Sequence, residues 1–287
     1  MISQYKIVLL LVFATFSVST SPILARLLSD VPAVGISFWR MAIGATILWI
    51  YSNFKSTASL STKNRNYTIL GGIFLGIHFQ FFFESIKLTT IANATFLGTL
   101  APLFTLFIEK FWLKRRIKKN MIFALAIIFT GSIIIISDQF DASSNYTVGN
   151  LYALICSFWI ALAFMISENV RKEAGTVAFS RTLFASAAIT LMMISFYTGE
   201  SLIGYSKMDY FGLFLLGLIP TVFGHSTFYF ALRYLQPTIV ASFPLGEPII
   251  ASVIAYFLFS EAVGSSIILG GILTILCLLT LVKLKKT

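Results

Sequence analysis

Long apolar runs alternate with short polar breaks along the whole chain. The runs are mostly about 18–24 residues long, and a helix of about 20 residues, at roughly 1.5 Å per residue, crosses the hydrocarbon core of a bilayer. The pattern therefore predicts an all-α membrane protein with ten transmembrane helices. These helices are expected at Tyr5–Leu28, Ala33–Tyr51, Tyr67–Ile86, Ile91–Leu113, Asn120–Ser137, Val148–Val170, Ala178–Tyr197, Tyr210–Leu232, Pro237–Phe259 and Ser265–Leu284.

The predicted span Pro237–Phe259 carries an acid between two prolines, in residues 244–248 (PLGEP). Pro244 and Pro248 lack a backbone donor, so carbonyls one turn earlier lose their partners. Such carbonyls are tolerated at membrane depth only where protein or water satisfies them. An ionised Glu247 there costs at least about 2.5–3.5 kcal/mol. The stretch predicts a kinked helix facing a polar cavity, although a packing role for the prolines and a buried arginine partner for Glu247 stay open.

Composition supports a lipid environment for the whole chain. Only 11% of the 287 residues are charged and 57% are hydrophobic, with a mean hydropathy of +0.90, whereas soluble domains carry about 25% charged residues. The N-terminal run resembles a signal peptide, but no sizeable soluble domain follows it, so we expect a membrane span there. Cys156 and Cys277 lie in apolar segments, which indicates packing residues rather than a disulfide framework.

The distribution of positive charge predicts the orientation. Basic residues gather in the loops on one side of the predicted spans, and the opposite loops hold only Arg26, Lys87 and Lys207. Cytoplasmic loops carry the excess of Lys and Arg, so both termini are predicted to lie inside. Basic loops against an anionic leaflet account for most of the net charge of +10, and we expect no nucleic-acid partner. The inner group is Lys6, Lys55, Lys63, Arg65, Lys114, Arg115, Arg116, Lys118, Lys119, Arg171, Lys172, Arg233, Lys283, Lys285 and Lys286.

The chain carries a weak internal repeat. Residues 33–40 align with residues 174–181 at an offset of 141, and an offset of 146 sets Pro102 against Pro248. Pro102 is therefore a third predicted helix kink. Each copy holds five spans, an odd number, so the second copy must enter the membrane from the opposite side. We expect two inverted five-helix repeats, at residues 1–141 and 142–287.

Several passages resemble a known family. They are residues 91–102 (IANATFLGTLAP), which follow the linker Lys87–Thr90, and residues 231–237 (ALRYLQP), 244–248 (PLGEP) and 259–261 (FSE). Over nearly its whole length the chain resembles the drug/metabolite transporter superfamily, specifically its EamA-type ten-helix members. In that family the fourth helix of a repeat typically ends in a glycine-glutamate pair. The second copy here has Ser260-Glu261, whereas Lys114-Arg115 in the first copy departs from the pattern.

The resemblance implies a central cavity between halves that rock in alternating access, lined by the first, third, fourth, sixth, eighth and ninth spans. Relatives export or take up amino acids and other small metabolites. Glu247 is the best candidate for charge recognition or proton coupling. The candidate substrate-binding residues are Glu247, His78, His225, Gln80, Trp159, Tyr229, Trp39 and Arg40.

Other interpretations of these residues stay open. His78 and His225, which align to within one position, either bind a substrate carboxylate or relay protons, or each bonds a neighbouring helix. Arg40 either captures an anionic substrate or pairs with an acid or, as we prefer from sequence, snorkels to the interface or braces the nearby loop. Glu109 and Glu168 lie near helix ends, where we expect them to be solvated.

The sequence argues against an enzyme, because it lacks His/Cys metal spacing and its close acidic pair, Asp138 and Asp141, falls in a short predicted loop. It also lacks a phosphate-cradling glycine loop for ATP, so we expect transport to be driven by gradients or by no energy source. We therefore expect no metal and no cofactor. The predicted function is a secondary transporter that exports an amino acid or similar metabolite; a membrane-embedded lipid-modifying enzyme or a lipid-headgroup flippase is the alternative. The expected partners are the small-molecule substrate, membrane lipid and a proton as coupling ion, with a homodimer as a further option. Short loops predict a bacterial inner-membrane location.

Overall fold

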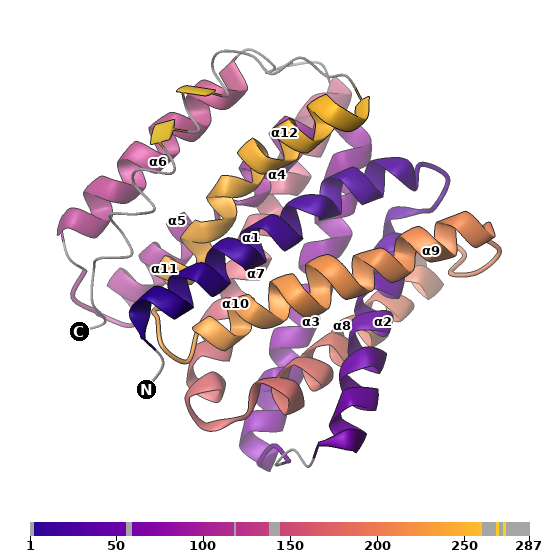
Figure 1. The fold of residues 1–287 in the computed structure, drawn as a ribbon, viewed down its shortest axis with the longest axis horizontal. Coiled ribbons are helices and arrows are strands. Elements are labelled where there is room, and N and C mark those ends of the chain that lie inside the picture. The colour runs from indigo at the N-terminus through magenta and orange to yellow at the C-terminus, as the bar shows by residue number, and fades with distance from the viewer. Residues whose placement is uncertain are drawn as a thin grey trace.

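The described part of the protein, in a computed structural model, comprises residues 3–55, 59–117, 119–137 and 144–259, with the short pieces 268–269 and 272–273. All its secondary structure is helical (Figure 1). The described elements are α1 (Gln4–Leu27), α2 (Ala33–Phe54), α3 (Thr62–Leu88), α4 (Ile91–Gly98), α5 (Ala101–Phe107), the π-helix η1 (Ile108–Trp112), α6 (Lys119–Ser137), α7 (Ser144–Glu173), α8 (Thr176–Thr198), α9 (Lys207–Leu216), the π-helix η2 (Gly217–His225), α10 (Ser226–Ala231), α11 (Pro237–Ser242), the 3-10 helix η3 (Phe243–Gly246) and α12 (Glu247–Phe259).

Eight stretches of the described residues are long and apolar enough to cross a membrane, and each overlaps one predicted span. They are Tyr5–Leu27, Ala33–Phe54, Thr62–Leu88, Ile91–Trp112, Tyr146–Glu173, Thr176–Thr198, Lys207–Ala231 and Pro237–Leu258. The predicted span Asn120–Ser137 coincides with α6, a helix of 19 residues. The predicted span Ser265–Leu284 lies outside the described residues, apart from the short helical pieces 268–269 and 272–273.

Three of the described helices, α3, α4 and α9, begin where a hydroxyl in a polar break caps them. The Ser61 hydroxyl accepts from the backbone of Asn64 at the start of α3, and the Thr90 hydroxyl accepts from Asn93 at the start of α4. Ser206 forms a capping box with Asp209 at the start of α9. These bonds satisfy backbone donors that have no intrahelical partner, so the polar breaks fix where the helices start.

Two spans are broken near their middle. The fourth span stops at Gly98 and restarts at Ala101, and Pro102 occupies the first turn of α5. The ninth passes from α11 through η3, which contains Pro244, into α12. The eighth continues as the π-helix η2, which contains Pro220. Proline removes a backbone hydrogen bond, and π-turns are frequent at functional sites. These interruptions therefore indicate where in the bundle a functional site is expected.

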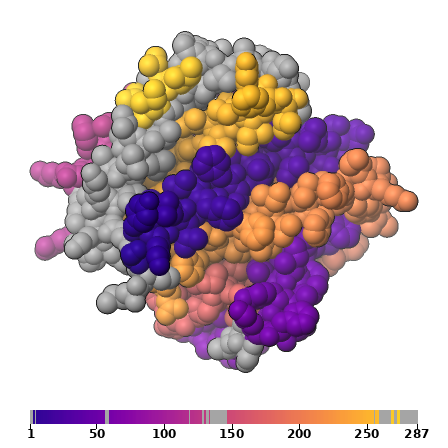
Figure 2. All heavy atoms as spheres, viewed as in Figure 1, coloured from indigo at the N-terminus to yellow at the C-terminus, as the bar shows by residue number. Residues whose placement is uncertain are grey.

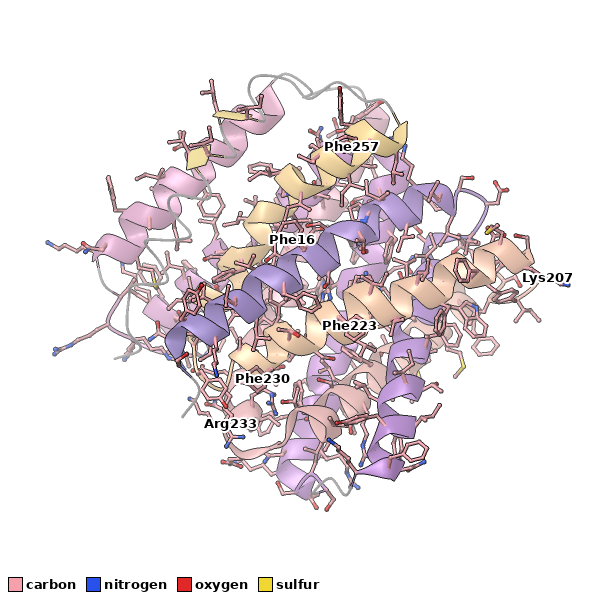
Figure 3. The ribbon with its side chains drawn as sticks, viewed as in Figure 1. Phe16, Lys207, Phe223, Phe230, Arg233 and Phe257 are labelled. Atoms are coloured by element: carbon pink, nitrogen blue, oxygen red, sulfur yellow. The ribbon has the colours of Figure 1, made fainter. Side chains whose placement is uncertain are left out.

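Helices from the first half of the chain pack directly against helices from the second half. Helix α3 packs against α7 and α8, α2 packs against α8, and α1 packs against η2 and α12. In Figure 2, α1 runs as an indigo band between α12 and the α9–α10 segment. Phe16, Phe223 and Phe257 point outward from these helices (Figure 3) and are exposed, as lipid-facing side chains are.

Glycine permits a close backbone contact between α3 and α8. A Cβ at Gly72 would lie 2.5 Å from the carbonyl oxygen of Leu183 and 2.6 Å from the Cβ of Ser186. The Ser186 hydroxyl donates to the Ile69 carbonyl at 2.8 Å across the same contact. Small residues let helix backbones approach in membranes, so Gly72 sets the separation of α3 and α8.

We expect Gly72→Ala to destabilise the protein by about 1–3 kcal/mol, because the added methyl meets backbone that cannot move aside cheaply. The matched control is Gly175→Ala, since a Cβ there has no atom within 4 Å; Gly175 is the N-cap of α8, where alanine is less favourable than glycine, so its effect should stay within about 1 kcal/mol. Thermal unfolding of the detergent-purified variants measures both. Equal melting temperatures for the two variants would contradict the close contact.

Candidate functional site

A cavity lies at the centre of the described bundle, beside both broken spans. It offers about 50 Å³ to the centres of water molecules, several times the roughly 10–15 Å³ that one water needs. Both halves of the chain contribute to its wall. The lining residues are Val18, Ser21, Arg40, His78, Phe79, Phe82, Gly98, Thr99, Ala101, Ile160, Phe164, His225, Phe228, Ala241, Pro244 and Glu247.

Arg40, from α2, is buried against this cavity with 1% of its surface exposed. Its Nη1 donates to the Ser21 hydroxyl at 2.9 Å and its Nε donates to Thr221 Oγ1 at 3.0 Å. The guanidinium carbon lies 4.1 Å from the centre of the Phe79 ring. The Nη2 nitrogen is buried without a hydrogen-bond partner. The snorkelling interpretation of Arg40 is therefore wrong, because the guanidinium turns inward and keeps one nitrogen free.

The π-helix η2 orients the hydroxyl that holds Arg40. Thr221 Oγ1 donates its only proton to the carbonyl of Leu216, five residues earlier, at 2.9 Å. Its lone pairs are thus left to accept from Arg40, as a hydroxyl has one donor and two acceptor sites. Both side-chain partners of the guanidinium are neutral hydroxyls, so no carboxylate of the described residues contacts it to compensate its charge.

Glu247 is the first residue of α12 and lines the same cavity from the ninth span. It is 6% exposed, and no residue in the described ranges hydrogen-bonds its carboxylate. Arg40 acts on it electrostatically, but no direct ion pair joins the two within the described chain. The interpretation that a buried arginine pairs with Glu247 therefore holds only as attraction across the cavity, and the carboxylate faces the water-sized space.

Both histidines also line the cavity, one from each half. Nδ1 of His78 lies 2.8 Å from the carbonyl oxygen of Cys156, on α7, and Nδ1 of His225 lies 2.9 Å from that of Pro220, in its own helix. A carbonyl only accepts, so each Nδ1 carries the proton, and Nε2 of the neutral ring is an acceptor. The interpretation that each histidine bonds a neighbouring helix is therefore confirmed for His78 and wrong for His225, and the interpretation that they bind substrate or relay protons stays a prediction.

One aromatic ring lies at the centre of these groups. Phe79 contacts the His78 ring at 4.7 Å and the His225 ring at 5.1 Å between centroids. It also covers the guanidinium face of Arg40. The electron-rich face of an aromatic ring attracts a cation, so Phe79 holds Arg40 in place without neutralising it.

Two of the predicted cavity residues, Trp39 and Trp159, contact partners outside the cavity lining. Trp39 donates from Nε1 to the carbonyl of Leu202 at 2.7 Å and packs edge-on against Tyr210. Trp159 packs against Phe74, with ring centroids 5.3 Å apart. The structure therefore places Trp39 and Trp159 outside the cavity lining, Trp39 bracing a loop and Trp159 packing between helices.

Gln80 and Tyr229 also lie outside the cavity lining. Gln80 donates to Glu84 at 3.1 Å on its own helix. The Tyr229 ring is fully buried and packs against Phe164 and Phe179. The sequence placed these residues on the right helices, but one step of about 100° around a helix turns a side chain from one neighbour to another.

The three predicted kink prolines differ in their surroundings. Pro244 lines the cavity, within η3. Pro248 directly follows Glu247 in α12, and Pro102 lies one residue after the cavity residue Ala101. At the offset of 146, Ala101 matches Glu247. Both broken spans thus present matching positions to the cavity, and only the second copy supplies an acid.

Sequence reasoning missed the residues that hold Arg40, and it misplaced two acids. Ser21 and Thr221 carried no signal, since isolated hydroxyls are common in membrane helices. Glu109 and Glu168 are not solvated: they are 0% and 2% exposed, and both bond Arg115, at 2.9 and 2.7 Å. The signal for this pairing was Arg115 itself, at the point where the first copy departs from the repeat.

Comparison with known proteins agrees with this architecture. A sequence model described as the EamA-like transporter family matches the chain over residues 5–137 and 147–283. The chain is 22% identical over 280 residues to the pseudopaline exporter CntI of Pseudomonas aeruginosa, covering 97% of this chain and 96% of that protein. It is 21% identical over 254 residues to an S-adenosylmethionine uptake transporter of Rickettsia prowazekii, covering 88% and 83%.

A solved structure, described only as the crystal structure of a protein, has the same fold. It superposes with a TM-score of 0.79 at 16% identity, over 96% of each chain. The family match extends over nearly the whole chain, and the named relatives are transporters. The chain therefore belongs to the EamA-like transporter family and is a multi-span membrane transporter of a small molecule, not an enzyme.

Proposed function

We propose that the protein is a secondary transporter that exports an amino acid or a related zwitterionic metabolite across a bacterial inner membrane. The observation that carries this proposal is the central cavity, in which an unpartnered guanidinium nitrogen of Arg40 and an unbonded carboxylate of Glu247 line the same space. The two groups come from different halves of the chain, and they are opposite in charge. A ligand with one negative and one positive group complements both.

The chemistry of recognition follows from the two groups. The substrate carboxylate accepts from Arg40 Nη2, and the substrate ammonium group donates to Glu247. Hydrogen bonds between charged groups contribute about 1.5–3 kcal/mol each. The attraction between opposite charges is stronger in a site that excludes water, because the effective dielectric constant there is lower. S-adenosylmethionine, the substrate in the name of one relative, carries both an amino-acid carboxylate and an ammonium group, which supports this substrate class.

We propose that the two halves are inverted repeats that alternate access to the cavity. The family model matches the chain twice, and each half contributes a broken span and a histidine to the cavity wall. Lys207, at the start of α9, and Arg233, just after α10, lie at opposite ends of one span (Figure 3). In the N-in, C-in orientation that we propose from the distribution of basic residues, Arg233 lies on the inside and Lys207 on the outside.

We propose export coupled to protons, with Glu247 as the group that alternates between a proton and the substrate ammonium. Export rests on likeness to a relative named as an exporter; a second relative is named as an uptake transporter, so direction needs its own measurement. Because no residue in the described ranges hydrogen-bonds the Glu247 carboxylate, it is able to bind either cation. Substrate and proton then compete for one oxygen pair, which is the condition for exchange.

Glu247→Gln should reduce transport of zwitterionic substrates at least about tenfold, because the amide keeps the size of the side chain and loses the charge. It should also flatten the dependence of transport on pH. The measurement is uptake and efflux in proteoliposomes with a panel of labelled amino acids, with and without a pH gradient. Transport that is indifferent to both the substitution and pH would remove Glu247 from the mechanism.

Thr221→Val should weaken substrate binding and lower stability by about 1–3 kcal/mol, since it leaves Arg40 Nε buried without a partner. Thr221→Ser is the matched control, because it retains the hydroxyl that accepts from Arg40. The substrate KM in proteoliposomes should rise for Val and stay near wild type for Ser. An equal KM in all three proteins would contradict the role of Thr221 in positioning Arg40.

A further inference from the structure

We propose that a second charged cluster, formed by Glu109, Arg115, Glu168, Lys172 and Thr238, is a gate that closes the cavity toward the cytoplasm. We call it the Arg115 cluster. The inference rests on the alternating-access part of the proposed function, but it requires neither the substrate class nor the roles given to Arg40 and Glu247.

Arg115 joins two buried carboxylates. Its Nη1 donates to Glu109 Oε1 at 2.9 Å and its Nη2 donates to Glu168 Oε2 at 2.7 Å. The other oxygen of Glu109 accepts from the Thr238 hydroxyl at 2.6 Å, and Lys172 Nζ lies 3.3 Å from the other oxygen of Glu168. All four carboxylate oxygens therefore have partners, which is what burial of two acids requires.

The backbone is shaped to bring Arg115 to this place. The π-helix η1 ends at Trp112, and Lys114 adopts a left-handed conformation with φ of 51°. This conformation is uncommon for a residue other than glycine and persists only where surrounding contacts enforce it. The turn returns the chain, so that the Arg115 backbone also donates to the Glu109 carbonyl at 2.8 Å. Arg115 is therefore bound to Glu109 through both backbone and side chain.

The cluster also fixes the charge of its central arginine. Burial disfavours the guanidinium charge of Arg115, but the hydrogen bonds and charges of Glu168 and Glu109 outweigh it and raise the pKa of Arg115. Arg115 lies in the loop after η1. The cation is therefore permanent at any physiological pH, and the cluster opens by movement of its helices rather than by loss of that proton.

The cluster lies directly beyond the cavity on three helices. On α7, Glu168 is one turn past the cavity residue Phe164. On α11, Thr238 is three residues before the cavity residue Ala241. From Ala101, at the cavity, α5 and η1 lead to Glu109 eight residues on, roughly 12 Å along a helix. Each helix thus passes the cavity and then the cluster on its way to the basic end of the bundle.

The contacts connect the two halves of the chain. Glu109 and Arg115 belong to the first half, whereas Glu168, Lys172 and Thr238 belong to the second. The helices concerned pack together, since α5 contacts both α7 and α11. If the halves move apart at this end, Arg115 cannot keep both carboxylates. Opening the cavity on this side therefore requires the cluster to break.

A buried ionic cluster suits a gate because its net energy is small while its geometry is strict. The desolvation of the charges nearly cancels their attraction, and removing one partner leaves an uncompensated buried charge. Opening admits water, which replaces the lost partners of the carboxylates. The same residues are absent from the matching place in the repeat, where the offset of 146 sets Ala255 against Glu109 and Glu261 against Arg115. The gate is therefore specific to one side.

The test is access of a thiol reagent to the cavity. Cys156→Ala and Cys277→Ala remove the natural thiols, and Ala241→Cys adds one reporter to the cavity wall. Membrane-impermeant maleimide is applied to inside-out and right-side-out vesicles.

In this background Arg115→Gln should raise the labelling rate from the cytoplasmic face by about tenfold or more, since it leaves two buried acids without their common partner. The matched control, Arg116→Gln, removes an exposed neighbour of the same charge and should leave the rate unchanged.

Thr238→Val provides a milder second variant should Arg115→Gln fail to fold. It removes one hydrogen bond to Glu109 and should raise the rate about twofold to tenfold in the same direction. A rise confined to the cytoplasmic face supports the gate, even if transport assays exclude zwitterions as substrates, whereas a rise confined to the opposite face would contradict it. Labelling that is unchanged in both variants, or that rises equally from both faces, would overturn it.

Discussion

In a lipid environment, the guanidinium of Arg40 is held by two neutral hydroxyls and a phenyl ring, and no carboxylate in the described part of the chain contacts it. A buried charge without an ionic partner is costly, and the surrounding structure is organised around this cost. The π-helix η2 supplies Thr221, and the first span supplies Ser21. The nearest compensation is Glu247, which acts across the cavity rather than by contact. The cavity therefore keeps both charges available to a ligand that carries their complements.

Two sets of buried charged residues in the described protein differ in whether their polar atoms have protein partners. The cavity pair leaves an Arg40 nitrogen and the Glu247 carboxylate without protein partners. The Arg115 cluster satisfies every carboxylate oxygen from both halves of the chain. In the proposed transport cycle, the first arrangement binds ligand and the second holds one conformation until the halves separate. The cavity and the Arg115 cluster follow each other along the same helices, so the proposal connects binding to closure.

Much of the fold was predictable because membrane helices follow from length and hydropathy alone. The eight membrane-length stretches each overlap a predicted span, and the PLGEP stretch marked the break at the cavity. The site was predictable only in part. Glu247, His78, His225 and Arg40 line the cavity, but Gln80, Trp39, Trp159 and Tyr229 do not, since the sequence gives no rotation of a helix that is apolar on all sides. Burial of Glu109 and Glu168 depends on Arg115, whose turn at Lys114 is set by tertiary contacts.

The central claim is that a zwitterion bridges Arg40 and Glu247. The most direct measurement is an experimental structure, by electron cryomicroscopy, of the protein with a transported amino acid bound. The account predicts the ligand carboxylate within hydrogen-bond distance of Arg40 Nη2 and its ammonium group within that distance of Glu247. A ligand bound with its charged groups away from both residues, or a Glu247 side chain that faces lipid, would contradict the account.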